Sequence, residues 1–168
     1  MRSPGRGTIR FWSMDGEDSA ALRSIETLLD GAGFDCVASR DIATDIWEKC
    51  AFNGALNALG AITRRPNGGL DNPDGRAIAE AVVDEAVAAA AALGVPVKQA
   101  RILAKIDNAV THHRAHKGSM LQDVLAGRPT EIDHINGAIV RAADAAGLAA
   151  PVNRTLVHLM RLIQDSQG

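Results

Sequence analysis

The segment of about residues 76–93 most constrains the fold, because it is predicted to be a helix with apolar residues on nearly every face. It is rich in Ala and Val, and it ends at a helix-stopping Gly94, Val95 and Pro96. A helix without a polar side is usually buried at the centre of a helical domain. We therefore expect other helices to surround this one.

The rest of the chain after residue 41 also predicts helices, since Ala is abundant, aromatic residues make up only 3% and β-branched runs are few. A loop is expected at residues 64–75, which are dense in turn-forming residues. Thr130-Glu131-Ile132-Asp133 has the form of a capping box and predicts the start of a helix. The predicted helices cover about residues 42–61, 76–93, 98–115, 119–126, 130–146 and 152–165.

The beginning of the chain predicts a different structure. Thr8–Trp12 and Phe34–Ala38 have the pattern of short strands. Between them, Asp18 and Ser19 can cap a helix that runs through Leu29. Two strands are too few for a sheet that is stable alone. The predicted fold class is therefore mainly α.

Composition and charge exclude several functions. The net charge of −2 and pI of about 6.2 give no electrostatic basis for binding nucleic acid or an anionic membrane. Met1–Arg6 lacks the apolar core of a signal peptide, and no apolar run is long enough to span a bilayer. Cys36 and Cys50 lie far apart and form no CxxC. We therefore expect a reduced, cytoplasmic protein.

One predicted helix carries an unusual row of polar residues. Lys49, Asn53 and Asn57 are spaced by four and therefore lie along one side of the helix. Asn is a poor helix former, by roughly 0.5 kcal/mol or more relative to Ala. The row therefore indicates a functional face, although an exposed lysine and interhelical amides would also explain it.

Four segments resemble the C-terminal domain of ketopantoate reductase (2-dehydropantoate 2-reductase): IWEKCAFNGALNALGAI, RPNGGL, GSMLQDVLAGRPTEIDHINGAIV and AAGLAAPVNRTL. The resemblance covers about residues 42–165. It implies a helical substrate and catalytic domain of the 6-phosphogluconate-dehydrogenase-like type at residues 42–168. Residues 1–41 would then be a β-α-β remnant of a nucleotide-binding Rossmann domain.

The family's GxGxxG motif, which holds the pyrophosphate of NADPH at a helix N-terminus, is not found in this sequence. Gly5-Arg6-Gly7 and Gly68-Gly69 do not supply it. The resemblance therefore implies that NADP is the cofactor of a complete, two-domain protein. This chain alone is not expected to bind the cofactor or to be active.

The resemblance also implies roles for individual residues. Lys49 matches the lysine that protonates the developing alkoxide, and Glu131 matches the carboxylate that accepts a hydrogen bond from the substrate hydroxyl. The matched substrate-binding residues are Asn53, Asn57, Asn67 and Ser119.

Simpler roles exist for three of these residues. Asn67 would be an ordinary turn residue before Gly68, Ser119 a helix N-cap, and Glu131 an acid in the first turn of a helix. A metal site at His112, His113 and His116 is disfavoured, because no third ligand or HExxH motif accompanies the two histidines spaced by four. We interpret them as a polar helix end followed by a loop.

Three functions remain open. The first is an oxidoreductase that reduces 2-dehydropantoate to pantoate with NADPH, in pantothenate biosynthesis. The second is a noncatalytic helical module for dimerisation or binding, and the third is a reductase of another keto acid. The expected partners are a small keto acid and, in a homodimer, a second copy of the chain.

Overall fold

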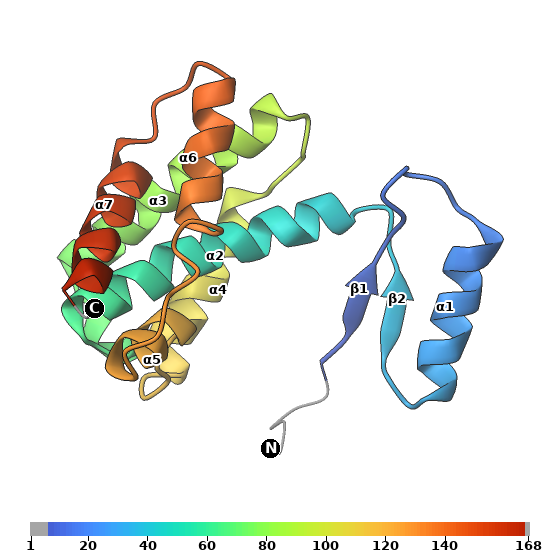
Figure 1. Cartoon of the computed structure of the whole chain (residues 1–168), viewed down its shortest axis with the longest axis horizontal. Coiled ribbons are helices and arrows are strands. Elements are labelled where there is room, and N and C mark those ends of the chain that lie inside the picture. Colours follow the sequence, from blue (N-terminus) through green and yellow to red (C-terminus); the bar gives the residue numbers. More distant parts are fainter. Residues whose placement is uncertain (1–6, 167–168) are drawn as a thin grey trace. The chain divides into compact units, whose positions relative to one another are not determined.

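The computed structural model describes residues 7–166 and divides into two compact units, Met1–Asp45 and Ile46–Gly168. Figure 1 shows the elements of both units along the chain. The interpretation of Met1–Arg6 lies outside the described residues.

The first unit has the predicted β-α-β form. Two parallel strands pair in a register that places Ile9 opposite Cys36. Ser19 caps the helix between them, because its hydroxyl accepts a hydrogen bond from the Leu22 amide at 3.2 Å. The elements are β1 (Ile9–Phe11), α1 (Ala20–Gly31) and β2 (Cys36–Ala38).

This small unit leaves much of its apolar surface uncovered. Ile25 and Leu28 of α1 are 50% and 72% exposed, and Phe34 is 53% exposed. Leu22 is its one buried core side chain among the described residues. With two three-residue strands, the unit has little to protect its backbone hydrogen bonds.

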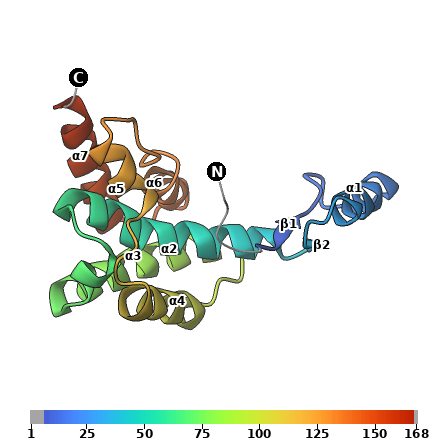
Figure 2. The same ribbon diagram turned by 90° about the horizontal axis from the view of Figure 1, so that it is seen from below.

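The second unit is helical, and the predicted mainly α fold is confirmed. Figures 1 and 2 show α2 passing between the other helices of this unit. None of the helices in the described range 7–166 is long and apolar enough to cross a membrane. The elements are α2 (Ile42–Thr63), the 3₁₀ helix η1 (Asn67–Leu70), α3 (Pro73–Ala92), α4 (Gln99–His112), α5 (Ser119–Leu125), α6 (Asn136–Ala145) and α7 (Pro151–Asp165).

The prediction of a central helix without a polar side is wrong for α3, because Arg76, Glu80 and Asp84 lie on an exposed side of it. Its other side is buried. Val82, Val83 and Ala86 have at most 1% of their surface exposed, and α3 packs on α4, α6 and α7. α2 is buried as deeply, since every residue of the range 54–61 is buried. Small residues on both helices allow this close packing.

Two of the buried polar side chains, Asn136 and Asn153, form a network of buried amides. Asn136 of α6 donates to the Gly54 carbonyl of α2 at 3.1 Å and to Asn153 Oδ1 of α7 at 3.0 Å. Asn153 donates in turn to the Val82 carbonyl at 3.3 Å and to Glu85 Oε2 at 2.7 Å, both on α3. Both asparagines are fully buried. The network thus joins four helices.

The same network extends to the start of α7. The Glu85 carboxylate accepts hydrogen bonds from the backbone amides of Val152 and Asn153 at 2.8 and 2.9 Å. These amides lie in the first turn, where a helix has no acceptors of its own. Glu85 therefore caps α7 from a neighbouring helix.

The predicted helix start at Thr130 is wrong, because α6 begins at Asn136. The Thr130 hydroxyl and amide both bond to Gln164 Oε1 of α7, at 2.6 and 2.7 Å. The following residues form turns that bury Ile132, and Glu131 is therefore not in the first turn of a helix. Contacts with α7 and the core outweigh the local capping motif.

Another boundary moves in the opposite direction. α3 begins at Pro73, three residues before the predicted start, because Asn72 caps it by accepting from the Gly75 amide at 3.0 Å. The other predicted boundaries in this unit agree to within three residues.

We predict that the amides of β1 and β2 exchange with solvent faster than those of α3, since few buried apolar contacts protect the first unit. Hydrogen exchange followed by NMR in a monomeric sample measures this. Equal protection in β1 and α3 would contradict the prediction.

We also predict that Asn153→Ala lowers the free energy of unfolding by about 2–3 kcal/mol, because it removes the three side-chain hydrogen bonds of Asn153 and one of the two acceptors of Asn136. Urea unfolding followed by circular dichroism measures the loss. Asn108→Ala, at an exposed position of α4, is the matched control and should change stability by less than about 0.5 kcal/mol.

Candidate functional site

The polar row on α2 borders three adjoining hollows of the helical unit. Lys49 lines two of them, Asn53 lines two, and Asn57 lines one. The helix spacing of four residues therefore places all three side chains on hollowed surface.

The first hollow, which we call the amide pocket, has a volume of about 440 Å³. Its wall includes the four predicted substrate-binding residues Asn53, Asn57, Asn67 and Ser119. Asn57 and Asn67 are buried, and the Asn57 amide donates to the Ser119 hydroxyl at 3.2 Å. The remaining wall residues are Phe52, Leu56, Ala109, His113, His116 and Gly118.

Gly118 is a wall residue that the sequence analysis did not identify. A methyl group at this position would lie 2.5 Å from Asn57 Oδ1, so glycine lets the backbone approach the amide. Gly118 is also the N-cap of α5, and Ser119 is the first residue of that helix. The simpler N-cap role for Ser119 is therefore wrong, and its hydroxyl faces Asn57 instead.

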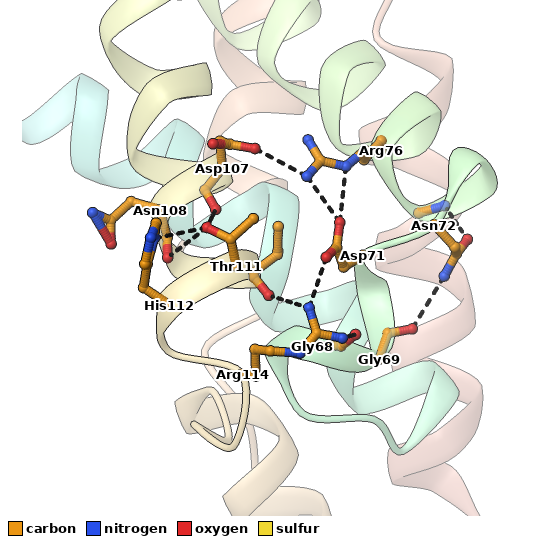
Figure 3. A network of polar contacts seen from close by, with 12 residues as sticks. Gly68, Gly69, Asp71, Asn72, Arg76, Asp107, Asn108, Thr111, His112 and Arg114 are labelled. Carbon is orange, nitrogen blue, oxygen red and sulfur yellow. Dashed lines mark hydrogen bonds and ion pairs between the residues drawn. The ribbon is translucent and has the colours of Figure 1, made fainter.

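An ion-pair network fixes the segment that carries Asn67. Figure 3 shows Asp71, just after η1, between two arginines. Asp71 accepts from Arg76 of α3 at 2.8 Å and from Arg114 at 2.7 Å. The two guanidinium groups, Arg114 first, lower the pKa of the Asp71 carboxyl. Arg76 also pairs with Asp107 of α4 at 2.9 Å.

Backbone hydrogen bonds complete this attachment. The Asn67 amide donates to the His116 carbonyl at 3.0 Å, and the Gly68 amide donates to the Arg114 carbonyl at 2.9 Å. Arg114 in turn donates to the Gly68 carbonyl at 3.1 Å (Figure 3). A methyl group on Gly68 would lie 2.7 Å from Arg114 Cβ, so the two segments are in close contact. Asn67 and His116 are thereby held next to each other in the wall of the amide pocket.

The second hollow, the α2–α6 pocket, has a volume of about 490 Å³ and contains Lys49 and Asn53. Its other wall residues are Ile46, Trp47, Cys50, His134, Ile135 and Ala138. The Cys50 thiol donates to the Ile135 carbonyl at 3.7 Å, and burial raises its pKa. This thiol is therefore a neutral wall group.

The third hollow, the α2–α4 groove, has a volume of about 640 Å³. Glu48 lies in its wall and is fully buried, which the sequence analysis did not predict. Lys105 Nζ lies 2.9 Å from Glu48 Oε2, and an Arg101 guanidinium nitrogen lies 3.3 Å from Oε1. The other wall residues are Lys49, Phe52, Ala104, Asn108, Ala109 and His113.

Lys49 is exposed, unlike its neighbour Glu48. Over residues 7–166, no hydrogen bond or ion pair engages its ammonium group. An unpaired ammonium between two hollows can donate to a carbonyl or carboxylate oxygen of a ligand.

Glu131 is exposed and lines none of these three hollows. Its backbone carbonyl accepts from the amides of His134 and Ile135, each at 3.0 Å. Glu131 therefore lies on the turn that leads into the α2–α6 pocket. The structure shows no bond between Glu131 and Lys49 within the described range.

The three clustered histidines divide between two environments. His112 ends α4, and its Nδ1 lies 2.8 Å from the Thr111 hydroxyl. His113 and His116 line the amide pocket. Within residues 7–166, no group of three or more His, Cys, Asp and Glu side chains is placed to hold a metal ion.

Sequence comparison identifies relatives over most of the chain. The family model for the C-terminal part of the ketopantoate reductases PanE/ApbA matches residues 41–164. A 2-dehydropantoate 2-reductase of Archaeoglobus fulgidus is 35% identical over 162 residues, which cover 96% of this chain and 54% of the relative. The chain thus spans about half the length of the relatives it matches.

Solved structures show the same similarity. A PanE/ApbA family ketopantoate reductase from Ralstonia eutropha JMP134 matches with a TM-score of 0.88 and 33% identity, over 99% of this chain and 54% of that one. A D-mandelate dehydrogenase with NADH and anilino(oxo)acetate matches with a TM-score of 0.89 and 26% identity, over 97% and 54%. The resemblance carried by the sequence motifs is confirmed. The chain therefore belongs to the ketopantoate reductase PanE/ApbA family and corresponds to the C-terminal domain of its members.

Proposed function

We propose that this chain is the substrate-binding and proton-donating part of an NADPH-dependent reductase of 2-dehydropantoate. The observation that carries the proposal is the unpaired Lys49 ammonium, which shares the α2–α6 pocket with Asn53 in a member of this family. The complete activity requires a nucleotide-binding domain in addition to the residues described here.

Lys49 has the role of general acid. When bound, NADPH would supply a hydride to the ketone carbon, and the ketone oxygen would then need a proton. An ammonium group beside that oxygen stabilises the developing negative charge and then gives the proton. Asn53 lies one helical turn away and can hold the substrate by donating or accepting a hydrogen bond.

The amide pocket is proposed to bind the polar end of the substrate. Asn57, Asn67 and Ser119 offer amide and hydroxyl donors to a carboxylate without adding charge. Because Gly118 and the Asp71 network hold these walls in place, the donors are already positioned before the ligand binds.

Glu131 is proposed to accept a hydrogen bond from the substrate hydroxyl. The support is its match to the family motif and its place on the turn before His134, a wall residue of the α2–α6 pocket. No residue of this chain is proposed to hold the cofactor's pyrophosphate, since no glycine-rich turn of the required form precedes a helix in residues 7–166.

A second candidate is reduction of a different 2-keto acid, one with an aromatic side chain. The similarity to D-mandelate dehydrogenase supports this, and so do the apolar wall residues Ile46, Trp47 and Ile135 of the α2–α6 pocket. Comparing kcat/KM for 2-dehydropantoate with kcat/KM for benzoylformate separates the two candidates. A homodimer, a cytoplasmic location and a role in pantothenate biosynthesis remain predictions.

We predict that Lys49→Ala lowers kcat by about 10²-fold or more when this chain is joined to the nucleotide-binding domain of the Archaeoglobus fulgidus relative, the usual scale for losing a general acid. Steady-state kinetics measure the loss. Lys98→Ala, an exposed lysine outside all three hollows, is the matched control. Near-normal turnover of Lys49→Ala would show that Lys49 is not the general acid and that the polar row is an ordinary polar helix face.

We also predict that Glu131→Gln in the same joined protein raises KM for the keto acid and lowers kcat, while the Kd for NADPH changes less than about twofold. The reason is that an amide accepts the substrate's hydrogen bond less strongly than a carboxylate does. Glu80→Gln, on an exposed position of α3, is the control. An effect on NADPH binding alone would argue against this role.

A further inference from the structure

The α2–α4 groove has apolar and charged walls in a defined arrangement. Phe52 of α2 and Ala104 and Ala109 of α4 form its apolar part. Lys49 and Lys105 place ammonium groups in the same wall, one from each helix. At about 640 Å³, the groove has room for a small organic molecule.

The buried carboxylate of Glu48 explains why Lys105 is held there. A buried carboxylate is stable only with paired charges, and Glu48 has both Lys105 and Arg101 beside it. Lys105 Nζ has three donors, and Glu48 is the only acceptor for them within residues 7–166. Glu48 therefore positions the Lys105 ammonium, and the N–H donors of Lys105 that do not bond to Glu48 remain available for a ligand.

The groove carries an excess of positive charge. Two lysines and one glutamate line it, and Arg101 adds another positive charge beside Glu48. The nearest acidic residue on α4, Asp107, is already paired with Arg76 at 2.9 Å. Within the described residues, Lys105 forms an ion pair with Glu48 and with no other carboxylate. Lys49 forms no ion pair within the same residues.

Two further polar residues complete the wall. Asn108 lies one turn after Lys105 on α4, and His113 follows the end of that helix. The Asn108 amide and the His113 ring each offer a hydrogen-bond donor to an oxygen atom. A carboxylate satisfies these groups and the excess charge together, whereas a neutral or cationic molecule does not.

We propose that the α2–α4 groove is a binding site for a small organic acid with an apolar body. Its carboxylate lies at Lys105 and Lys49, and its apolar part lies on Phe52, Ala104 and Ala109. The site needs no reductase chemistry. It shares Phe52, Ala109 and His113 with the amide pocket and Lys49 with the α2–α6 pocket, whereas Ala104, Lys105 and Asn108 line this groove alone of the three. The site would therefore remain if the proposed reductase function were wrong.

Titration of the ¹⁵N-labelled chain with 3-phenylpropionate, followed by NMR, tests the proposal. This probe has a carboxylate and an apolar body but no ketone, so it is not a substrate of the proposed reaction. We expect saturable shifts centred on Ala104, Lys105 and Asn108. We also expect weaker binding at high salt, because half-exposed charges are screened, and little binding of the neutral amide 3-phenylpropionamide.

Three variants locate the site. Lys105→Gln is expected to raise the Kd about tenfold, which corresponds to the loss of a charge-assisted hydrogen bond. Asn108→Asp, an exposed change that leaves the partners of Glu48 intact, should give a similar increase by repulsion. Asn108→Asp therefore still tests the groove if Lys105→Gln does not fold. Lys98→Gln removes a charge outside the groove and should change the Kd less than about twofold.

Three results would overturn the proposal. They are the absence of saturable binding at about 10 mM probe, shifts confined to the α2–α6 pocket, and equal effects of Asn108→Asp and Lys98→Gln. The first and third show that the groove does not select an anion, and the second assigns the anion to the proposed substrate site. None of them tests whether Lys49 donates a proton.

Discussion

The buried hydrogen bonds of Asn136 and Asn153 are the interactions on which the helical unit most depends. The apolar part of the interior consists of alanine, valine, leucine, isoleucine and methionine, and apolar contacts of this kind have no direction that fixes how the helices meet. The two amides and the Glu85 carboxylate instead join α2, α3, α6 and α7 at defined backbone atoms. Because an unpaired buried amide is costly, other helix registers are disfavoured.

This constraint places the functional face. Gly54 accepts the hydrogen bond from Asn136, and it lies on the same helix, one residue after Asn53 and five after Lys49. Fixing α2 at Gly54 therefore fixes the direction in which its polar row points. The Asp71 network does the same for the segments that carry Asn67 and His116. The site is thus held by polar contacts that lie outside it.

Much of the candidate site could be predicted from the sequence because its spacing is local. Lys49, Asn53 and Asn57 share a face through helix geometry alone, and the turn formers around Asn67 predicted an irregular segment. Glu48 could also have been found, since Ala51 and Ala55 follow it at helical spacing on a buried face. Gly118 could not, because its importance is a 2.5 Å approach to a side chain 61 positions away.

The sequence by itself determined the helical character of the chain after residue 41, the polar row of α2 and the resemblance to the ketopantoate reductases. These follow from periodicity, composition and motifs, which are local properties of the chain. Only the tertiary structure decided that α6 begins at Asn136, that Ser119 faces Asn57, and that Glu48 pairs with Lys105 and Arg101. The physical reason is that each depends on groups far apart in sequence. Thr130 bonds to Gln164, Ser119 to Asn57, and Glu48 to two residues of α4. These distant contacts outweigh the local preferences for capping and exposure.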